Sequence, residues 1–225
     1  MLETFNSKER ISQTINAIRE ERIRKELPKR LKEAEIPKRY FDATFENMAI
    51  NGIPNELVRQ FEKAKCYADN FKENMNNGVG VIFSGSVGRL KTTMAVAILQ
   101  SVIKQGWQGY FISMPELLDK LVTFAKGDSK GRADFENKIR SVSLLVLDDM
   151  GAEYQNDWVL NKVDAIITHR YNEMLPIIIT TNLRLKEIKQ SYMLRVYDRL
   201  KQTSVHIYAN DVNGESKSYR GIYGT

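Results

Sequence analysis

The sequence predicts an α/β fold of three layers, in which a central parallel sheet carries helices on both faces. Short apolar runs that suit buried strands alternate with longer amphipathic segments that suit helices. Several of the apolar runs end in polar residues, as expected at the edge of a parallel sheet where ligands bind. A Gly-containing loop joins the first run to a helix, as phosphate-binding loops do. A short helical arm is expected to precede this fold.

Composition excludes several classes of protein. The chain has 225 residues, of which 42% are hydrophobic and 28% charged, so it is not wholly disordered and can bury a sizeable core. No apolar run approaches the roughly 18 residues of a membrane span, and the first residues do not resemble a secretory signal. The single cysteine, Cys66, excludes an intramolecular disulfide framework. These features predict a cytoplasmic protein with no membrane contact.

The N-terminal arm is predicted to be an amphipathic helix, with Asn6 and Glu9 as a capping box and an interruption near Pro28. Its charge is uneven, because residues 1–40 hold 11 Lys or Arg and 7 Asp or Glu, which gives +4 of the total +6. That balance permits nucleic-acid binding, but a solvated helix of mixed charge explains it equally well. The apolar stripe must pack on the protein's own core or on a partner. It comprises Ile11, Ile15, Ile18, Ile23, Leu27 and Leu31.

Residues 37–48 read as a linker, which divides the chain into an arm at 1–40 and a nucleotide-binding domain at 41–225. A helix over 57–71 opens that domain. The buried strands that follow are expected at 79–84, 109–114, 144–147, 177–180 and 205–208. The helices between and after them are expected at 92–104, 115–125, 135–140 and 158–174, with one or two helices over 185–201.

The first strand leads into a loop close to the Walker A pattern, G-x-x-x-x-G-K-[ST], with a helix behind it. Gly85, Lys91 and Thr92 match the pattern. In such loops the backbone N–H groups wrap the phosphates of ATP or ADP. Lys91 would reach the β- and γ-phosphates, and the Thr92 hydroxyl would take one Mg²⁺ position. The candidate nucleotide-binding residues are Gly85, Ser86, Val87, Gly88, Arg89, Leu90, Lys91, Thr92 and Thr93.

Leu90 stands where the pattern has its second glycine. If the backbone there needs a positive φ, leucine costs about 1–2 kcal/mol, and its side chain could crowd the phosphates. We therefore expect nucleotide binding to persist and hydrolysis to be slow. Leu90→Gly is expected to tighten ATP binding about tenfold, provided that about 1.4 kcal/mol of strain is relieved.

Two carboxylates end the third strand, in the Walker B arrangement. Asp148 would hold the Mg²⁺ ion through its water shell, and Asp149 would polarise the attacking water. The alternative is a strand that simply exits through a polar turn. Asn182, after the next strand, would lie beside the phosphate-binding loop and position the water or contact the γ-phosphate; its alternative is a helix cap.

Three arginines are further candidates. Arg195 and Arg199 are four residues apart and share one helix face. In an oligomeric ATPase one of them could reach a neighbour's γ-phosphate, whereas two arginines on an exposed face are otherwise solvated. Arg220 is a candidate for a further phosphate contact.

Taken together, these segments resemble the AAA+ replicative helicase loaders of bacteria and their phages, the DnaC/DnaI type, and are similar to the IstB-type transposition ATPases. The resemblance covers about residues 40–225. It is carried by TFENM, GSVGRLKTT, LLVLDDMGAE, ITHRYNEMLPIIITTN, RVYDRL and SYR, in that order.

The resemblance implies specific roles. Lys91 and Thr92 would form Walker A, and Asp148 and Asp149 Walker B, with Asn182 as sensor 1. Arg199 would be the arginine finger, with Arg195 as its substitute, and Arg220 a sensor 2-like arginine. The segment after Met114 would contact single-stranded DNA, unless its basic residues form a solvated face and its phenylalanines belong to the core. That segment includes Lys120, Phe124, Lys126, Lys130, Phe135 and Arg140.

The resemblance further implies a weak ATPase that self-associates through its ATP site and places a hexameric replicative helicase on single-stranded DNA during replication initiation. Residues 1–40 would grip the helicase. One alternative is an IstB-type transposition helper that binds duplex DNA and a transposase. Another is an adaptor that hydrolyses no ATP and binds a helicase or a host loader.

Overall fold

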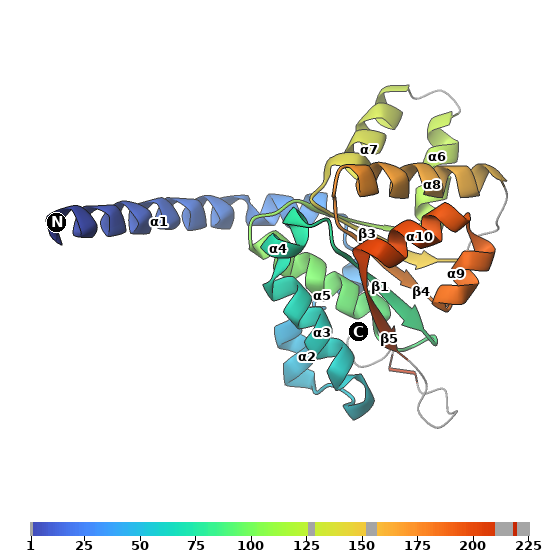
Figure 1. Cartoon of the computed structure of the whole chain (residues 1–225), viewed down its shortest axis with the longest axis horizontal. Helices are drawn as coiled ribbons and strands as arrows, with labels where there is room; N and C mark the ends of the chain where they lie inside the picture. The colour runs from blue at the N-terminus through green and yellow to red at the C-terminus, as the bar shows by residue number, and fades with distance from the viewer. Residues whose placement is uncertain (1, 126–128, 152–156, 210–217, 220–225) are drawn as a thin grey trace.

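The computed structural model describes residues 2–125, 129–151, 157–209 and 218–219. Its centre is a five-stranded sheet, ordered β2-β3-β4-β1-β5, in which all neighbouring strands run parallel. Figure 1 shows helices on both sides of this sheet, which confirms the predicted three-layer α/β fold. The strands are β1 (Gly80–Gly85), β2 (Gly109–Ser113), β3 (Leu144–Met150), β4 (Ile177–Thr181) and β5 (Ser204–Ala209).

The two faces of the sheet hold separate hydrophobic cores, because side chains alternate along each strand. In β1, Val81 and Phe83 join a cluster with α2, α3 and α5, whereas Ile82 joins a cluster with helices from α6 to α10. The helices are α1 (Leu2–Glu33), α2 (Phe45–Asn51), α3 (Val58–Asp69), α4 (Phe71–Asn76), α5 (Lys91–Lys104), α6 (Met114–Ala125), α7 (Ser129–Ser141), α8 (Asp157–Asn172), α9 (Leu185–Ser191) and α10 (Leu194–Thr203). Two 3-10 helices, η1 (Lys38–Tyr40) and η2 (Asn55–Leu57), also occur. None of the helices within these ranges is long and apolar enough to cross a bilayer.

Helix α1 is one helix, so the interruption expected near Pro28 is wrong. Proline removes its own N–H from the helical ladder and crowds the carbonyl four residues earlier, but here contacts with the rest of the molecule hold the turns around it. Leu27 and Leu31 pack on the core, and the Arg30 guanidinium donates to the Gly106 carbonyl. The capping-box prediction is also wrong, because the helix already begins at Leu2 and Asn6 lies inside it.

The two halves of α1 have different surroundings. Ile15 and Ile18 are 59% and 63% exposed, and this half projects from the body of the molecule (Figure 1). Ile23 instead lies close over Gly106, where an added Cβ would stand 2.8 Å from its side chain. The apolar stripe therefore packs on the protein's own core at its C-terminal end and remains uncovered further out.

Residues 37–48 are not the linker that their composition predicts. Ala43, Phe45 and Met48 are buried, and the Thr44 hydroxyl accepts the Asn47 N–H as the cap of α2. The Gln100 amide donates to three carbonyls of this segment, those of residues 40, 41 and 43. The segment thus packs on α5 as part of the core.

Glu35 joins the end of α1 to three other elements. Its carboxylate accepts hydrogen bonds from the Tyr110 hydroxyl at 2.9 Å and from the amines of Lys120 and Lys138 at 2.8 Å each. Partial burial alone would raise the pKa of Glu35, but these three bonds outweigh it and hold the pKa at about 2. The base of the arm is therefore tied to β2, α6 and α7.

Candidate functional site

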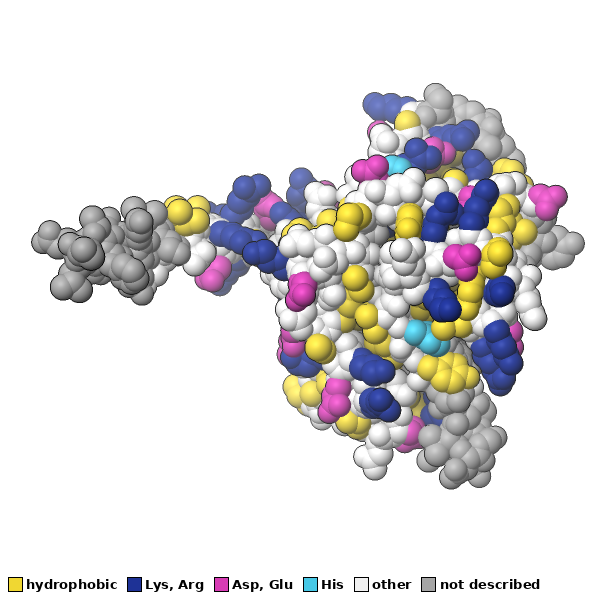
Figure 2. All heavy atoms as spheres, in the orientation of Figure 1, with side chains coloured by type: hydrophobic (Ala, Val, Ile, Leu, Met, Phe, Trp, Pro, Cys, Tyr) yellow, Lys and Arg dark blue, Asp and Glu magenta, His cyan; other side chains and the backbone are white. Residues whose placement is uncertain are grey.

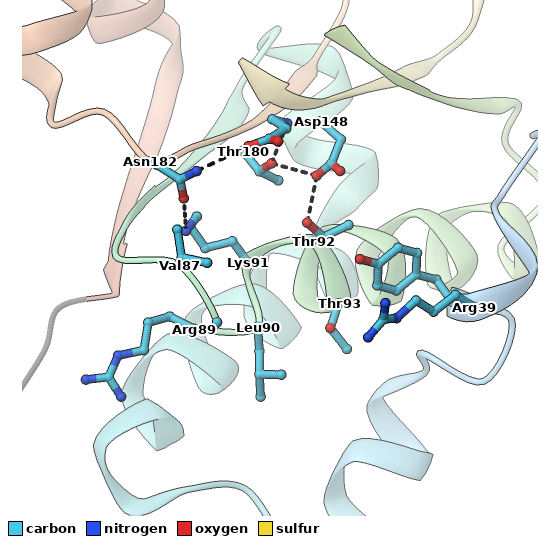
Figure 3. Close-up of a pocket in the computed structure, with 13 residues that line it drawn as sticks. Arg39, Val87, Arg89, Leu90, Lys91, Thr92, Thr93, Asp148, Thr180 and Asn182 are labelled. Atoms are coloured by element: carbon cyan, nitrogen blue, oxygen red, sulfur yellow. Dashed lines mark hydrogen bonds between the residues drawn. The ribbon is translucent and has the colours of Figure 1, made fainter. Parts of the chain in front are cut away.

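A pocket of about 270 Å³ opens at the carboxyl ends of β1, β3 and β4 (Figure 3). This is the edge at which the sequence places the candidate nucleotide-binding residues. The pocket is lined by residues 87–93, by Asp148, Asp149, Thr180 and Asn182, and by Arg39 and Tyr40 from the segment ahead of α2.

Lys91 is the first residue of α5 and is buried at the centre of the pocket. Its ammonium donates to the Gly85 carbonyl at 2.8 Å and the Ser86 carbonyl at 2.7 Å. A third bond, of 2.8 Å, reaches the Asn182 Oδ1 beyond β4. The amine therefore lies between the loop and the neighbouring strand, as a lysine that contacts bound phosphates must.

Asp148 meets two hydroxyls. Thr92 Oγ1 donates to Asp148 Oδ1 at 2.8 Å, and Thr180 Oγ1 donates to the same oxygen at 2.6 Å. Burial raises the pKa of Asp148 despite these two bonds, and the neighbouring Asp149 charge raises it further. A bound cation would offset that cost of ionisation, and hydroxyl and carboxylate oxygens are the ligands that Mg²⁺ prefers. The residues present therefore fit a magnesium ion.

Asp149 adopts the left-handed conformation, with φ +59°. Its N–H donates to Thr180 Oγ1 at 2.9 Å, and its Oδ1 accepts from the Asn182 amide at 3.3 Å. Aspartate is one of the residues that tolerate this conformation. The structure thus joins Asp149, Asn182 and Lys91 in one hydrogen-bonded chain, and Thr180, which the sequence analysis missed, orients both aspartates.

Leu90 has φ +56°, as expected for a position where the pattern has glycine. The expected crowding is wrong, because its side chain is buried in the core and points away from Lys91 and Asp148 (Figure 3). Glycine here would relieve about 1–2 kcal/mol of strain but remove a buried leucine worth about 2–5 kcal/mol. Leu90→Gly is therefore expected to lower stability, and the tenfold tighter ATP binding expected of it stays a prediction.

The charged side chain of Arg89 points away from Lys91 (Figure 3). Its guanidinium is buried, 3.6 Å from the Glu56 carboxylate and 5.7 Å from the Tyr219 ring centroid. The backbone of Arg89 remains in the loop, whereas its side chain points away from Lys91 (Figure 3), toward Glu56 of η2.

The structure does not bring Arg195 and Arg199 into the pocket of their own chain. Both lie on α10 and pair with Asp164 of α8, at 2.7 Å and 3.3 Å. Asp164 is largely buried, so these arginines are not simply a solvated face. Arg220 lies outside the described residues. Tyr219, directly before it, donates its N–H to the Gly88 carbonyl at 2.9 Å.

For the two phenylalanines of the segment after Met114, the structure favours the alternative in which they belong to the core. Phe135 is buried and its ring centroid lies 5.5 Å from that of Phe124, so the two rings belong to the core. Lys120 pairs with Glu35 and Glu116. Lys130 is exposed, Arg140 lies 3.9 Å from Glu136, and Lys126 is outside the described residues. Stacking of bases on Phe135 is therefore excluded as the protein stands.

Arg39 and Tyr40 are pocket residues that the sequence analysis missed. Their segment was interpreted as a linker, and no spacing rule connects it to the loop about 50 positions later. Only the packing of residues 40–43 on Gln100 brings them to the pocket beside Thr93 (Figure 3).

The strand order, the loop after β1 and the carboxylates that end β3 define the AAA+ class of P-loop ATP-binding proteins. Within that class, the chain belongs to the family of IstB-like ATP binding proteins, whose model matches residues 3–220.

Curated relatives come from replication and from an insertion sequence. The replicative helicase loader DnaI of Bacillus subtilis is 25% identical over 151 residues, which are 67% of this chain and 47% of DnaI. The replicative helicase loader DnaC of Escherichia coli K12 is 24% identical over 162 residues, which are 71% of this chain and 63% of DnaC. The putative ATP-binding protein of insertion sequence IS5376 from Geobacillus stearothermophilus is 28% identical over 155 residues, which are 68% of this chain and 56% of that protein. The chain thus spans less than two thirds of each of these relatives.

Solved structures agree on the fold. A crystal structure of the DnaC helicase loader superposes with a TM-score of 0.68 at 27% identity, covering 77% of this chain and 99% of that one. A crystal structure of DnaI gives 0.65 at 21% identity, with 77% and 94% covered. AMPPCP-bound DnaA from Aquifex aeolicus gives 0.62 at 20% identity, with 76% and 51% covered.

Proposed function

We propose that the pocket binds ATP together with Mg²⁺ and that the chain is a helicase-loader-like ATPase. The observation that carries the proposal is the convergence of Lys91, Thr92, Asp148 and Asn182 on one pocket. The N–H groups of residues 85–93 and the N-terminus of α5 would wrap the phosphates, and Lys91 would exchange its carbonyl contacts for phosphate oxygens.

Thr92 and Asp148 would hold the magnesium ion, which supplies charge neutralisation for the phosphates when bound. Asp149 is placed to accept a proton from an attacking water, and Asn182, bonded to both Asp149 and Lys91, is placed to orient that water. We expect slow turnover, because an aspartate takes the place usually held by the longer glutamate.

Self-association would complete the site. Arg199, or Arg195, would act as an arginine finger on the γ-phosphate of a second copy, and Arg220 would contact the phosphates in its own chain. Since both fingers already pair with Asp164, they would reach a neighbour from a fixed position on α10.

The partner proposed for the chain is a hexameric replicative helicase, which it would place on single-stranded DNA in the cytoplasm. The curated relatives named as replicative helicase loaders support this partner. The projecting half of α1 offers a means of binding, because Ile15 and Ile18 are exposed there. Lys and Arg side chains gather along the same arm (Figure 2). The exposed Lys130 on α7 is a remaining candidate for contact with DNA backbone.

A transposition helper is the second candidate, because the matching family model and the insertion-sequence relative both favour it. The adaptor without hydrolysis is the third candidate. Leu90 argues for it less strongly, since its buried side chain points away from Lys91 and Asp148 (Figure 3).

Co-purification separates these candidates. Full-length chain is mixed, with and without ATP and Mg²⁺, with the replicative helicase or the transposase of the same genome. A helicase complex that forms on addition of ATP and loads the helicase onto circular single-stranded DNA would support the first proposal. A complex only with the transposase on duplex DNA would replace it with the second. Helicase loading that proceeds without ATP hydrolysis would support the third candidate, the adaptor.

A further inference from the structure

The described residues 218–219 lie directly on the phosphate-binding loop. The Tyr219 N–H donates to the Gly88 carbonyl at 2.9 Å. Gly88 has φ +81°, and a Cβ at this position would stand 2.5 Å from the Ser218 Oγ and 2.8 Å from its Cα. Glycine is therefore required at position 88 both for the turn and for the close approach of the C-terminal segment.

The side chain of Tyr219 completes a cluster with Arg89 and Glu56. Its hydroxyl donates a short hydrogen bond to the Glu56 carboxylate. The Arg89 guanidinium lies 3.6 Å from the same carboxylate and 5.7 Å from the centre of the Tyr219 ring. Arg89 is only 1% exposed, and a buried guanidinium is stable only where charged or aromatic partners surround it. The cluster thus fixes the side chain of a loop residue to the C-terminal segment.

Leu90 belongs to the same assembly. Its side chain lies in the hydrophobic cluster against which Tyr219 packs, although its backbone is in the left-handed region. Strained backbone of this kind persists only where its surroundings hold it. Residues 88, 89 and 90 are each held from the side away from the pocket, and Lys91 and Thr92 follow them directly.

We propose that Tyr219 is a positioning residue of the nucleotide site. It holds Gly88, Arg89 and Leu90 in the conformation that presents Lys91 and Thr92 to the phosphates. The inference rests on the proposed ATP site. Because docking of Tyr219 and binding of nucleotide favour the same loop conformation, each strengthens the other by the same factor. It also explains how this loop accommodates leucine in place of glycine.

The test is a titration of the full chain with a fluorescent ATP analogue and Mg²⁺. Tyr219→Ala is expected to weaken binding about tenfold or more, and Tyr219→Phe, which keeps the ring, to weaken it less. The matched control is Tyr67→Phe. It also removes a tyrosine hydroxyl bond, 2.7 Å to the Val79 carbonyl, and neither residue lines the pocket. This control should lower the melting temperature and leave nucleotide affinity unchanged.

Hydrogen exchange adds a readout that a purely structural role would not move. In the wild-type chain, ATP with Mg²⁺ should slow exchange of the Tyr219 amide, which is the donor to Gly88. If the variant Tyr219→Ala does not fold, Tyr219→Phe and Glu56→Gln replace it in the test. The double variant should then lose less binding free energy than the sum of the losses in the two single variants.

The outcomes are distinct. A wild-type chain that binds no nucleotide overturns the proposed ATP site and this inference with it. Wild-type binding that is matched in affinity by Tyr219→Ala, or by both substitute variants, overturns the positioning role alone. Weakened binding in the Tyr219 variants with an unchanged Tyr67→Phe control supports it.

Discussion

At the scale of single residues, the site depends on two non-glycine residues in the left-handed region, Leu90 and Asp149. Each is fixed by a specific contact: burial of the side chain for Leu90, and the Thr180 hydroxyl for Asp149. The sequence alone could predict the strain at Leu90 from the missing glycine. It could not predict where the side chain points, because that depends on the core beneath α5.

Leu90→Gly and Leu90→Ala test this account as a pair. Both lose the same buried side chain and should lower the free energy of unfolding by about 1–4 kcal/mol. If the backbone at position 90 were right-handed, the alanine variant would be more stable than the glycine variant. At φ +56° the glycine variant should instead be more stable than the alanine variant, by about 1 kcal/mol. Urea denaturation of both variants measures which of them is more stable. Greater stability of Leu90→Ala would show that the backbone at this position is right-handed in solution.

Glu35 should give the chain a measurable acid sensitivity. Its pKa is held at about 2 in the folded state, below the ordinary value of 4.5, so the unfolded state binds the proton more tightly. Its stabilising contribution is therefore complete above about pH 4.5 and is lost as the pH falls toward 2. Thermal melts across this range should show a shallower decline for Glu35→Gln than for the wild type. Parallel declines would mean that the three donors do not stabilise the carboxylate.

At the scale of elements, the apolar strands and the helices between them follow from periodicity, since strands buried on both faces read as short apolar runs. Three features did not follow. Helix α1 continues through Pro28, residues 37–48 pack on α5, and α7 begins at Ser129, earlier than its apolar residues suggest. In the first two cases tertiary contacts from distant segments outweigh the local signal, whereas the early turns of α7 carry the local Arg132–Glu136 pair.

The two halves of α1 should respond differently to the same substitution. Ile15→Asp places a charge on an exposed surface and should leave the melting temperature unchanged, but abolish binding to the partner. Leu31→Asp, at the packed end, should lower the melting temperature sharply because its charge meets the core. Differential scanning fluorimetry and co-purification measure the two effects. Loss of the thermal transition in Ile15→Asp would place the projecting stripe in the protein's own core.

At the scale of the whole molecule, the pocket and the candidate arginine fingers lie on different parts of the surface. Lys91 and Asp148 belong to the pocket, whereas Arg195 and Arg199 pair with Asp164 on α8 and α10. Under the arginine-finger proposal, ATP hydrolysis would require at least two copies, each of which contributes one part of the site. The sequence could predict the residue types for this arrangement, but the separation between them appears only in the fold.

Mixing two inactive variants tests whether the site is shared. Lys91→Ala removes the phosphate contact and Arg199→Ala removes the finger, so each alone should hydrolyse ATP at a small fraction of the wild-type rate. In mixtures, some interfaces combine an intact pocket with an intact finger, and activity should partly return. The control is a mixture of Lys91→Ala with Asp148→Asn, which damages the pocket in both partners. Activity that depends neither on mixing nor on protein concentration would contradict a shared site.

The most direct measurement of the central claim is equilibrium binding of ATP to the wild-type chain and to Asp148→Asn, with and without Mg²⁺. The account predicts saturable binding by the wild type that strengthens when Mg²⁺ is added. It predicts that Asp148→Asn loses most of this strengthening, because one unit of negative charge leaves the metal site next to Thr92. A wild-type chain that binds no ATP, or a variant with the full Mg²⁺ effect, would contradict the assignment of this pocket as a magnesium-dependent ATP site.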